Sequence, residues 1–253
     1  MPPKPCLLLT GFEPFGGDPT NPSAEVVRQL EGRRHGSHRI VGAVLPCVFG
    51  ECRRALAELL ARHRPAAVIA LGVAAGRAAI TPERVAINVD DARIPDNAGR
   101  QPVDVPVEPG GPAACWSTLP LKAIVAALQA EGIPAEVSNS AGTFVCNHLF
   151  YGLMRTLEQP DWRGVPGGFI HLPCRPEEAR PGQASLPFAT LVRAIDVAIR
   201  ITLEGLSQAA PAGDGGRRSR ARRASSSRRP SSTSGRGRPP AASSSSLRAA
   251  RRR

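Results

Sequence analysis

The chain has 253 residues, and its formal net charge of +12 comes entirely from one end of the sequence. Residues 209–253 contain thirteen arginines and a single acidic residue, Asp214, whereas residues 1–208 contain 20 basic and 20 acidic residues. A neutral body of this length can bury the core of one domain, and its charge balance argues against a nucleic-acid-binding fold. We therefore expect a folded domain over residues 1–208 and a separate tail over residues 209–253.

Several other classes of protein are also excluded by composition. No stretch approaches the roughly 20 apolar residues that span a membrane, and the N-terminus lacks the apolar core of a signal peptide. Six cysteines are too few for a disulfide scaffold, and neither a CxxC nor an HExxH motif occurs. We expect a protein of the reducing cytoplasm without a zinc site.

Strand-like and helix-like segments alternate along the body. Short apolar or alternating runs predict strands at residues 6–9, 39–45, 66–71, 135–138 and 168–172, with a weaker candidate at 84–89. Apolar residues at helical spacing predict helices at residues 24–30, 51–64, 119–131, 147–157 and 187–206. This alternation predicts an α/β/α sandwich in which helices cover both faces of an open, mostly parallel sheet. Residues 90–112, rich in proline and glycine, form a long loop, and long ordered loops are often functional.

The tail has a different composition from the body. It contains eleven serines, four prolines and one large aliphatic residue, Leu247, so it cannot bury enough apolar surface to fold, and we expect it to be disordered. Two interpretations remain open. The tail is either a solvated appendage or a product of GC-rich or frame-shifted coding, or it binds nucleic acid or another polyanion through counterion release.

Cys146 is the best candidate for a nucleophile. Small polar residues lead from the predicted strand 135–138 to this cysteine, which opens a helix. A helix N-terminus presents unpaired N–H groups and the positive end of the helix dipole, which can receive an oxyanion. The same features are expected to lower the thiol pKa below about 8.5. The alternative is that Cys146 is a small buried apolar residue.

A thiol nucleophile usually needs a base, and the five histidines can be compared. His35 and His38 lie in a polar turn, and His63 ends a charged helix. His148 lies two residues after the cysteine, and positions i and i+2 do not face each other on a helix. His171 remains, at the end of the predicted strand 168–172, although a hydrogen-bonded core histidine is an equally simple interpretation.

A carboxylate should orient the imidazole and stabilise its charged form. Glu83 is a candidate, and Asp90, Asp91 and Asp96 compete for the same role. A surface carboxylate is the alternative for Glu83, which spacing alone does not exclude.

The segment TGFEPFGG at residues 10–17 follows the first predicted strand. It matches neither a P-loop nor a GxGxxG motif. Phe12 and Phe15 lie in its glycine- and proline-rich turn, where a core role is less obvious than in a strand.

At these residues the sequence resembles pyroglutamyl peptidase I, the pyrrolidone-carboxylate peptidases. Six blocks carry the resemblance in the same order, from about residue 7 to residue 206: TGFEPFGG with NPS (21–23), ERVAIN (83–88), DARIPDN (91–97) with QP (101–102), STLP (117–120), AGTFVCNH (141–148) and GFIHLP (168–173). The resemblance implies a three-layer α/β/α sandwich and a cytosolic homotetramer that needs no metal or organic cofactor. It also implies a cysteine peptidase that removes N-terminal pyroglutamyl residues from peptides.

The resemblance also assigns roles to residues. It implies Cys146 as nucleophile, His171 as general base and acid, and Glu83 as the orienting carboxylate. Phe12, Phe15 and Phe144 match positions that sandwich the pyroglutamyl ring, and Arg93 is expected to aid the backbone N–H groups around Cys146 in holding the oxyanion.

Two residues depart from the family pattern. Val73 stands in GVAAGR (72–77) where the family has a glutamine that contacts the substrate lactam, and valine cannot form that hydrogen bond. Cys174 replaces the usual aromatic residue after the HLP segment. Two alternatives to an active pyroglutamyl peptidase therefore stay open: a weak relative that binds polyanions through its tail, and a hydrolase of another cyclic amide.

Overall fold

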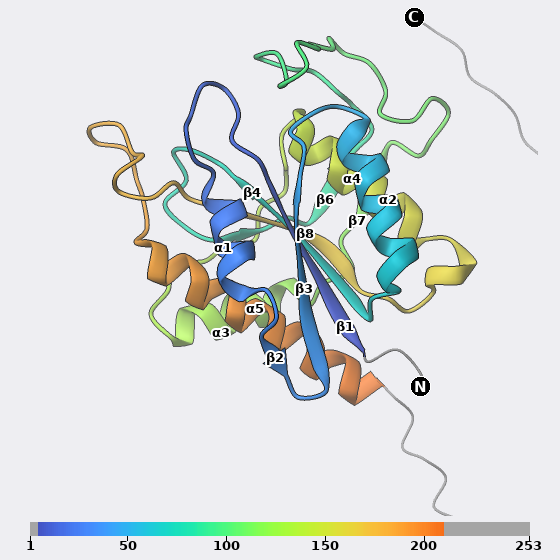
Figure 1. Cartoon of the computed structure of the whole chain (residues 1–253), viewed down its shortest axis with the longest axis vertical. Helices are drawn as coiled ribbons and strands as arrows, with labels where there is room; N and C mark the ends of the chain where they lie inside the picture. Colours follow the sequence, from blue (N-terminus) through green and yellow to red (C-terminus); the bar gives the residue numbers. More distant parts are fainter. Residues whose placement is uncertain (1–4, 210–253) are drawn as a thin grey trace, which may run out of the picture. The chain divides into compact units, whose positions relative to one another are not determined.

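The computed structural model describes residues 5–209, so the predicted tail, apart from its first residue, lies outside the described part. Figure 1 shows the elements of this part. The strands of the main sheet are β1 (Cys6–Phe12), β2 (Arg34–His35), β3 (His38–Leu45), β4 (Ala67–Val73), β5 (Thr81–Pro82) and β8 (Gly167–Leu172). The helices are α1 (Pro22–Leu30), α2 (Glu51–His63), α3 (Leu121–Ala130), α4 (Val145–Leu157), η1 (Pro160–Trp162) and α5 (Phe188–Ala209).

The main sheet has the strand order β2-β3-β1-β4-β8-β5. Its four central strands β3, β1, β4 and β8 are parallel, and the two-residue strands β2 and β5 pair antiparallel at the edges. Two further strands, β6 (Val85–Ile87) and β7 (Ala114–Trp116), form a separate antiparallel pair. The prediction of an α/β fold with a mostly parallel sheet is confirmed.

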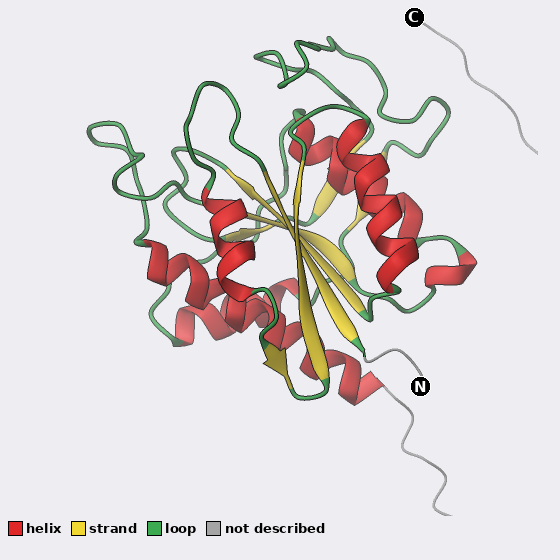
Figure 2. Ribbon diagram, viewed as in Figure 1, coloured by secondary structure: helices red, strands yellow, loops and turns green. Residues whose placement is uncertain are grey.

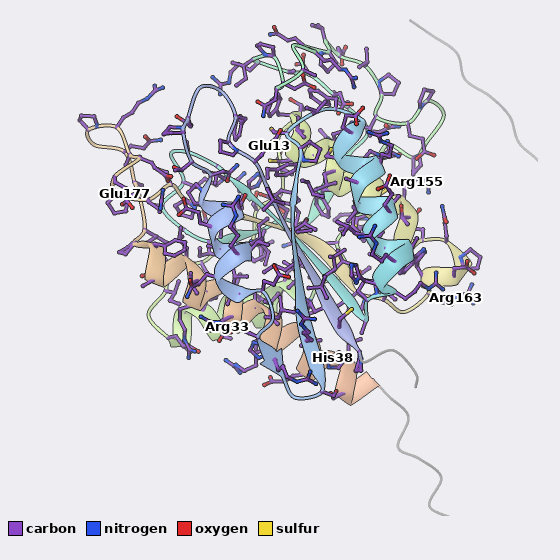
Figure 3. All side chains as sticks on the ribbon, viewed as in Figure 1. Glu13, Arg33, His38, Arg155, Arg163 and Glu177 are labelled. Atoms are coloured by element: carbon purple, nitrogen blue, oxygen red, sulfur yellow. The ribbon has the colours of Figure 1, made fainter. Side chains whose placement is uncertain are left out.

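Helices cover both faces of this sheet (Figure 2). Side chains of β1 alternate between the faces: Leu7 and Leu9 pack with α1, α3 and α5, whereas Leu8 and Phe12 pack with α2 and α4. Because β1, β4 and β8 are buried on both faces, they are largely apolar runs, whereas β3 is only partly buried. Charged side chains such as Arg163 and Glu177 are exposed and project away from the ribbon (Figure 3).

The carboxyl ends of the four parallel strands meet at one edge of the sheet, where α/β proteins place their sites. The chain returns sharply from β1 into α1 at this edge. A Cβ at Gly11 would lie 2.6 Å from the carbonyl oxygen of Ser23, so only glycine permits this approach. Asn21 caps α1 by accepting a hydrogen bond from the Ser23 N–H (3.0 Å), and the Ser23 hydroxyl accepts from the Phe12 N–H (3.0 Å). The block TGFEPFGG with NPS is therefore a turn that fixes Phe12 and the loop after it.

The predicted strand at residues 135–138 is wrong in detail. This segment runs parallel to β5 but makes only two isolated bridges, Ile80 with Ala135 and Glu83 with Ser138. Pro82 lies between the two bridges, and its missing N–H interrupts the ladder. The weaker candidate at 84–89 is a strand, β6, but it pairs with β7 rather than with the main sheet.

Among residues 5–209, no helix combines the length and the apolar composition that crossing a membrane requires.

Candidate active site

Cys146 is the second residue of α4, which begins two residues earlier than predicted. The helix has no side-chain cap at Phe144, and within residues 5–209 the backbone N–H groups of Val145, Cys146 and Asn147 donate to no acceptor. The side chain of Cys146 is partly exposed, whereas the other five cysteines are buried. One accessible thiol therefore lies beside free N–H donors at a helix N-terminus.

The thiol packs directly on the backbone of β4. A Cβ at Gly72 would lie 2.8 Å from Cys146 Sγ and 2.8 Å from the ring of Phe169, closer than side chains approach each other. Gly72 pairs in register with His171 of the neighbouring strand β8. Phe169 and His171 are two residues apart, so they project from the same face of the sheet, and their rings are 4.8 Å apart. This places the thiol and the imidazole on one face of the sheet at the same level.

His171 is held by Glu83. The Nδ1 atom of His171 lies 2.7 Å from Glu83 Oε1, and both side chains are buried. Because an ionised carboxylate can only accept, Nδ1 carries the proton and Nε2 is left with a free lone pair. Glu83 reaches this position because its own N–H donates to the carbonyl of Phe169 (2.8 Å), which aligns the residue after β5 with β8.

The competing carboxylates are engaged elsewhere. Asp90 Oδ2 lies 2.7 Å from His148 Nδ1, and His148 Nε2 accepts the Gly50 N–H at 3.0 Å, so both nitrogens of that ring are occupied. Asp96 accepts hydrogen bonds from three backbone N–H groups, and Asp91 is exposed. Of the four candidate carboxylates, the structure brings only Glu83 to His171.

The electrostatics of the site differ from the sequence-based expectation. Burial raises the pKa of the Cys146 thiol above its ordinary value, and the charge of Glu83 adds to that rise while Arg77 opposes it. This direction is opposite to the predicted lowering of the thiol pKa, and loss of solvent around the sulfur is its largest cause.

The pKa values of the other two groups are both depressed. Burial lowers the pKa of His171, and the hydrogen bond that its Nδ1 donates to Glu83 only partly offsets this. Burial alone would raise the pKa of Glu83, but hydrogen bonding with His171, Ser138 and Arg77 holds it below its ordinary value. The resting site accordingly pairs a neutral thiol with a neutral imidazole and an ionised carboxylate.

The aromatic residues divide into two groups. Phe12 is only 2% exposed and contacts Phe169 at a centroid distance of 6.5 Å, so it belongs to the core under the site. Phe15 and Phe144 are partly exposed and lie 5.8 Å apart. Phe49, which the sequence analysis missed, packs edge-on against Phe144 at 5.5 Å. The signal that could have revealed Phe49 is its position just after β3, at the same edge of the sheet.

Arg93 and Val73 lie at the same edge but make fewer contacts. Arg93 is exposed, and its side chain forms no hydrogen bond with any residue in the described range. Val73 is the last residue of β4, directly after Gly72, and is partly buried.

The long loop at residues 90–112 is tied to both sides of the site. Asn97 donates from Nδ2 to Glu13 Oε1 and to the Pro14 carbonyl, both at 2.9 Å. The Asp91 N–H donates to the Thr143 carbonyl (2.9 Å), and the Thr143 hydroxyl donates to the Asp91 carbonyl (2.7 Å). The loop therefore joins the turn that carries Phe15 to the segment that precedes Cys146.

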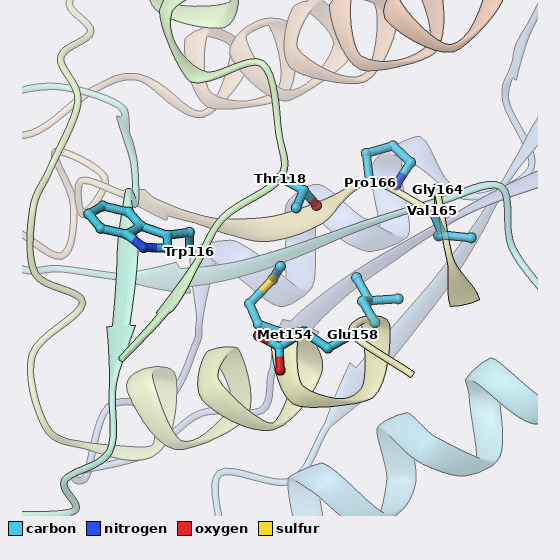
Figure 4. A pocket seen from close by; sticks show the side chains of 8 residues that line it. Trp116, Thr118, Met154, Glu158, Gly164, Val165 and Pro166 are labelled. Carbon is cyan, nitrogen blue, oxygen red and sulfur yellow. The ribbon is translucent and has the colours of Figure 1, made fainter. Parts of the chain in front are cut away.

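A surface cavity of about 380 Å³ lies elsewhere, between the end of α4 and the start of β8 (Figure 4). It is lined by Trp116, Thr118, Met154, Leu157, Glu158, Gly164, Val165 and Pro166. None of the candidate site residues lines it. No group of three or more His, Cys, Asp or Glu side chains within residues 5–209 could hold a metal ion.

Known proteins resemble this chain over nearly the whole described part. Pyrrolidone-carboxylate peptidase of Cupriavidus pinatubonensis is 56% identical over 199 residues, which cover 78% of this chain and 92% of the relative. The enzyme of that name from Klebsiella pneumoniae is 54% identical over 199 residues, with the same coverage.

Solved structures agree with these relatives. Pyroglutamyl peptidase I of Bacillus amyloliquefaciens matches with a TM-score of 0.76 and 47% identity, covering 79% of this chain and 98% of that one. Pyrrolidone carboxyl peptidase of Pyrococcus furiosus matches with a TM-score of 0.77 and 40% identity, covering 79% and 99%. The two alternatives, a polyanion-binding relative and a hydrolase of another cyclic amide, receive no support. A family model described as pyroglutamyl peptidase matches residues 6–205, and the chain belongs to this family of cysteine peptidases.

Proposed function

We propose that Cys146, His171 and Glu83 are the groups with which this chain removes N-terminal pyroglutamyl residues from peptides. The observation that carries the proposal is the Glu83–His171 hydrogen bond of 2.7 Å on the strand that pairs in register with Gly72, over which the Cys146 thiol lies. A nucleophile, a base and an orienting carboxylate on one face of the sheet are the parts that acyl transfer by a thiol requires.

The reaction begins with a proton transfer. Because the thiol is neutral at rest, His171 takes its proton at Nε2 while Nδ1–H stays on Glu83, and the imidazolium that forms is stabilised by that carboxylate. The thiolate attacks the pyroglutamyl carbonyl carbon. The oxyanion of the tetrahedral intermediate is received by the free N–H groups at the start of α4, with Arg93 as a further donor when substrate is bound.

The second half of the reaction reverses the proton flow. The Nε2 proton of His171 passes to the leaving amine, the C–N bond breaks, and a thioester with Cys146 remains. His171 then accepts a proton from water as the water attacks the thioester, and pyroglutamate leaves with the thiol restored. Glu83 keeps the imidazole in one tautomer throughout.

The flat pyroglutamyl ring binds between aromatic side chains. Phe15 and Phe144 are the pair that we assign to this role, because both are partly exposed and lie beside the start of α4. Phe49 supports Phe144 from the side. Phe12 contributes mainly from beneath, through Phe169. Such a site suits a substrate without a free amine, since it offers apolar walls rather than a carboxylate.

The test is hydrolysis of pyroglutamyl-aminomethylcoumarin by the wild type, Cys146→Ala and His171→Ala. We expect both variants to lose at least about 1000-fold in kcat/KM. Cys115→Ala is the matched control, because Cys115 is a buried cysteine of β7, outside the proposed site. Wild-type turnover by Cys146→Ala would rule out this thiol as the nucleophile.

We further propose that the enzyme is a cytoplasmic homotetramer. The resemblance to pyroglutamyl peptidase I supports both points, and the six cysteines, all of them within residues 5–209, are free, as expected in a reducing compartment. Light scattering on the purified protein should give four times the chain mass of 26.7 kDa. A monomer mass at micromolar concentration would contradict the tetramer without affecting the assignment of the site.

A further inference from the structure

Arg77 lies in the loop between β4 and β5 and reaches three separate segments. Its Nη1 atom donates to Thr81 Oγ1 at 2.5 Å and to Glu83 Oε1 at 2.6 Å, and its Nη2 donates to the Ser140 carbonyl at 3.0 Å. Ser140 belongs to the segment that leads into α4 and Cys146. One guanidinium therefore joins the loop after β4, the strand that precedes Glu83 and the loop that leads into α4.

Arg77 also acts on His171 along two routes. Glu83 Oε1 accepts from both Arg77 Nη1 and His171 Nδ1, so the guanidinium and the imidazole share a single oxygen. The Thr81 hydroxyl, which accepts from Arg77, donates in turn to the His171 carbonyl at 3.4 Å. His171 is thus connected to Arg77 in two ways: through its imidazole by way of Glu83, and through its backbone carbonyl by way of Thr81.

Glu83 needs a permanent positive charge nearby. Its side chain is 0% exposed, and an isolated carboxylate in such surroundings takes up a proton rather than stay charged. His171 does not provide that charge at rest, because burial lowers its pKa. A guanidinium is a permanent positive charge in proteins, and that of Arg77, 2.6 Å away, compensates the buried carboxylate.

The thiols around Cys146 are neutral at rest. Burial raises the pKa of both Cys47 and Cys52 to about 12, and it raises that of Cys146 as well, so these thiols bring no charge to the resting site. Within the described part of the chain, Glu83 and Arg77 are the charged groups that act on His171.

We propose that Arg77 is a positioning residue that keeps Glu83 ionised beside His171 and thereby sets the lower end of the pH range in which the enzyme works. The inference rests on the proposed function, because it takes His171 as the base. Removal of the guanidinium has two effects of the same sign. The imidazolium of His171 is no longer repelled by the charge of Arg77, and the Glu83 carboxylate no longer has that charge beside it. The Glu83–His171 pair therefore takes up its first proton at a higher pH.

The experiment compares pH profiles of kcat/KM for pyroglutamyl-aminomethylcoumarin between pH 5 and 9. In Arg77→Met we expect the acid limb to move up by about 1 to 3 pH units, the usual effect of an adjacent opposite charge. Arg77→Lys keeps the charge but cannot reach all three acceptors, so its acid limb should stay in place while kcat falls.

Arg155→Met is the matched control. The side chain of Arg155 is 31% exposed, against 29% for Arg77, and it also forms ion pairs, with Glu108 and Glu158, but on the outer part of α4. Its loss should leave the pH profile unchanged.

The rate at which iodoacetamide alkylates Cys146, measured across the same pH range, reports the protonation of the Glu83–His171 pair in the absence of substrate. It should show the same displacement in Arg77→Met. If Arg77→Met does not fold, the inference is tested on Arg77→Lys, for which a displaced acid limb in either assay would overturn it.

The outcomes separate the inference from the proposed function. One set of results would refute the role of Arg77 and leave the proposed peptidase activity intact. In it, the wild type is active, Cys146→Ala is inactive, and the pH profile of Arg77→Met differs from that of the wild type only in its maximal kcat/KM. An inactive wild type would instead refute the proposed function.

Discussion

Gly72 offers a direct test of where the nucleophile lies. The change is Gly72→Ala, which adds one methyl group to β4 and replaces none of the proposed catalytic side chains. The backbone of Gly72 does not adopt the positive φ that only glycine favours, so alanine meets no backbone strain there. Any effect must come from the space that the new Cβ occupies.

The magnitude follows from the contacts. The new Cβ would lie 2.8 Å from Cys146 Sγ, whereas ordinary contacts begin at 3.4 Å, so the sulfur must retreat by about 0.6 Å or more. A misplacement approaching 1 Å costs up to about 100-fold in rate, and we expect kcat/KM to fall about 10- to 100-fold. The Phe169 ring must also shift, and overpacking of this kind destabilises a core by about 1–3 kcal/mol.

Gly42→Ala separates these two effects. A Cβ at Gly42 in β3 would lie 2.9 Å from the Cγ1 atom of Val27 in α1, so this variant has a comparable clash on the opposite face of the sheet. It should lose stability in urea denaturation but keep wild-type kcat/KM while folded. Full activity in Gly72→Ala, or an equal loss of activity in both variants, would refute the position assigned to the thiol.

Three further predictions address the neighbouring residues. Val73→Gln, which restores the residue of the family pattern, should lower KM for pyroglutamyl-aminomethylcoumarin about 2- to 10-fold, the value of one hydrogen bond, and an unchanged or higher KM would count against a lactam contact there. Because the folded pKa of His171 is depressed, the folded protein binds its proton less readily than the unfolded chain, and its free energy of unfolding should fall as pH drops below about 6.5. In His171→Gln this fall in urea-melt stability should be smaller; an equal fall would show that His171 does not contribute. Asp90→Asn should cost about 1–3 kcal/mol in the same melts, because it weakens the buried bond to His148, and a change below about 0.5 kcal/mol would contradict that role.

Much of the fold could be predicted because local signals and packing agree. The bounds of the helices predicted at 24–30 and 51–64 lie within two residues of those of α1 and α2, where Asn21 and Pro22 mark the start of α1 and Pro65 follows the end of α2. The strand at 135–138 could not be predicted correctly, because its pairing depends on Pro82, more than fifty residues earlier. The two-stranded pair β6-β7 joins segments that the long loop separates, and no local pattern marks that contact.

The site was partly accessible to the same reasoning. Comparison of the histidines led to His171, and the structure gives both nitrogens of the nearest competitor, His148, other partners. The predicted lowering of the Cys146 pKa is opposite to the shift in the structure. A helix N-terminus can be recognised in a sequence, whereas the burial that raises this pKa cannot. Arg77 was also missed as a partner of Glu83. An arginine in a glycine- and alanine-rich loop carries no sign of which carboxylate it will meet.

The position of β8 in the sheet has a consequence for synthesis of the protein. Among the strands of residues 5–209, β8 is the last to leave the ribosome, yet it lies between β4 and β5 rather than at an edge. Until it has emerged, β4 keeps an unpaired edge, and the cysteine of α4 has no histidine beside it. A nascent chain without β8 therefore exposes a strand edge to which chaperones can bind. It also lacks a complete set of catalytic residues and cannot cleave other peptides. Peptidase activity should appear only after β8 has paired with β4, so activity reports on the assembly of the sheet.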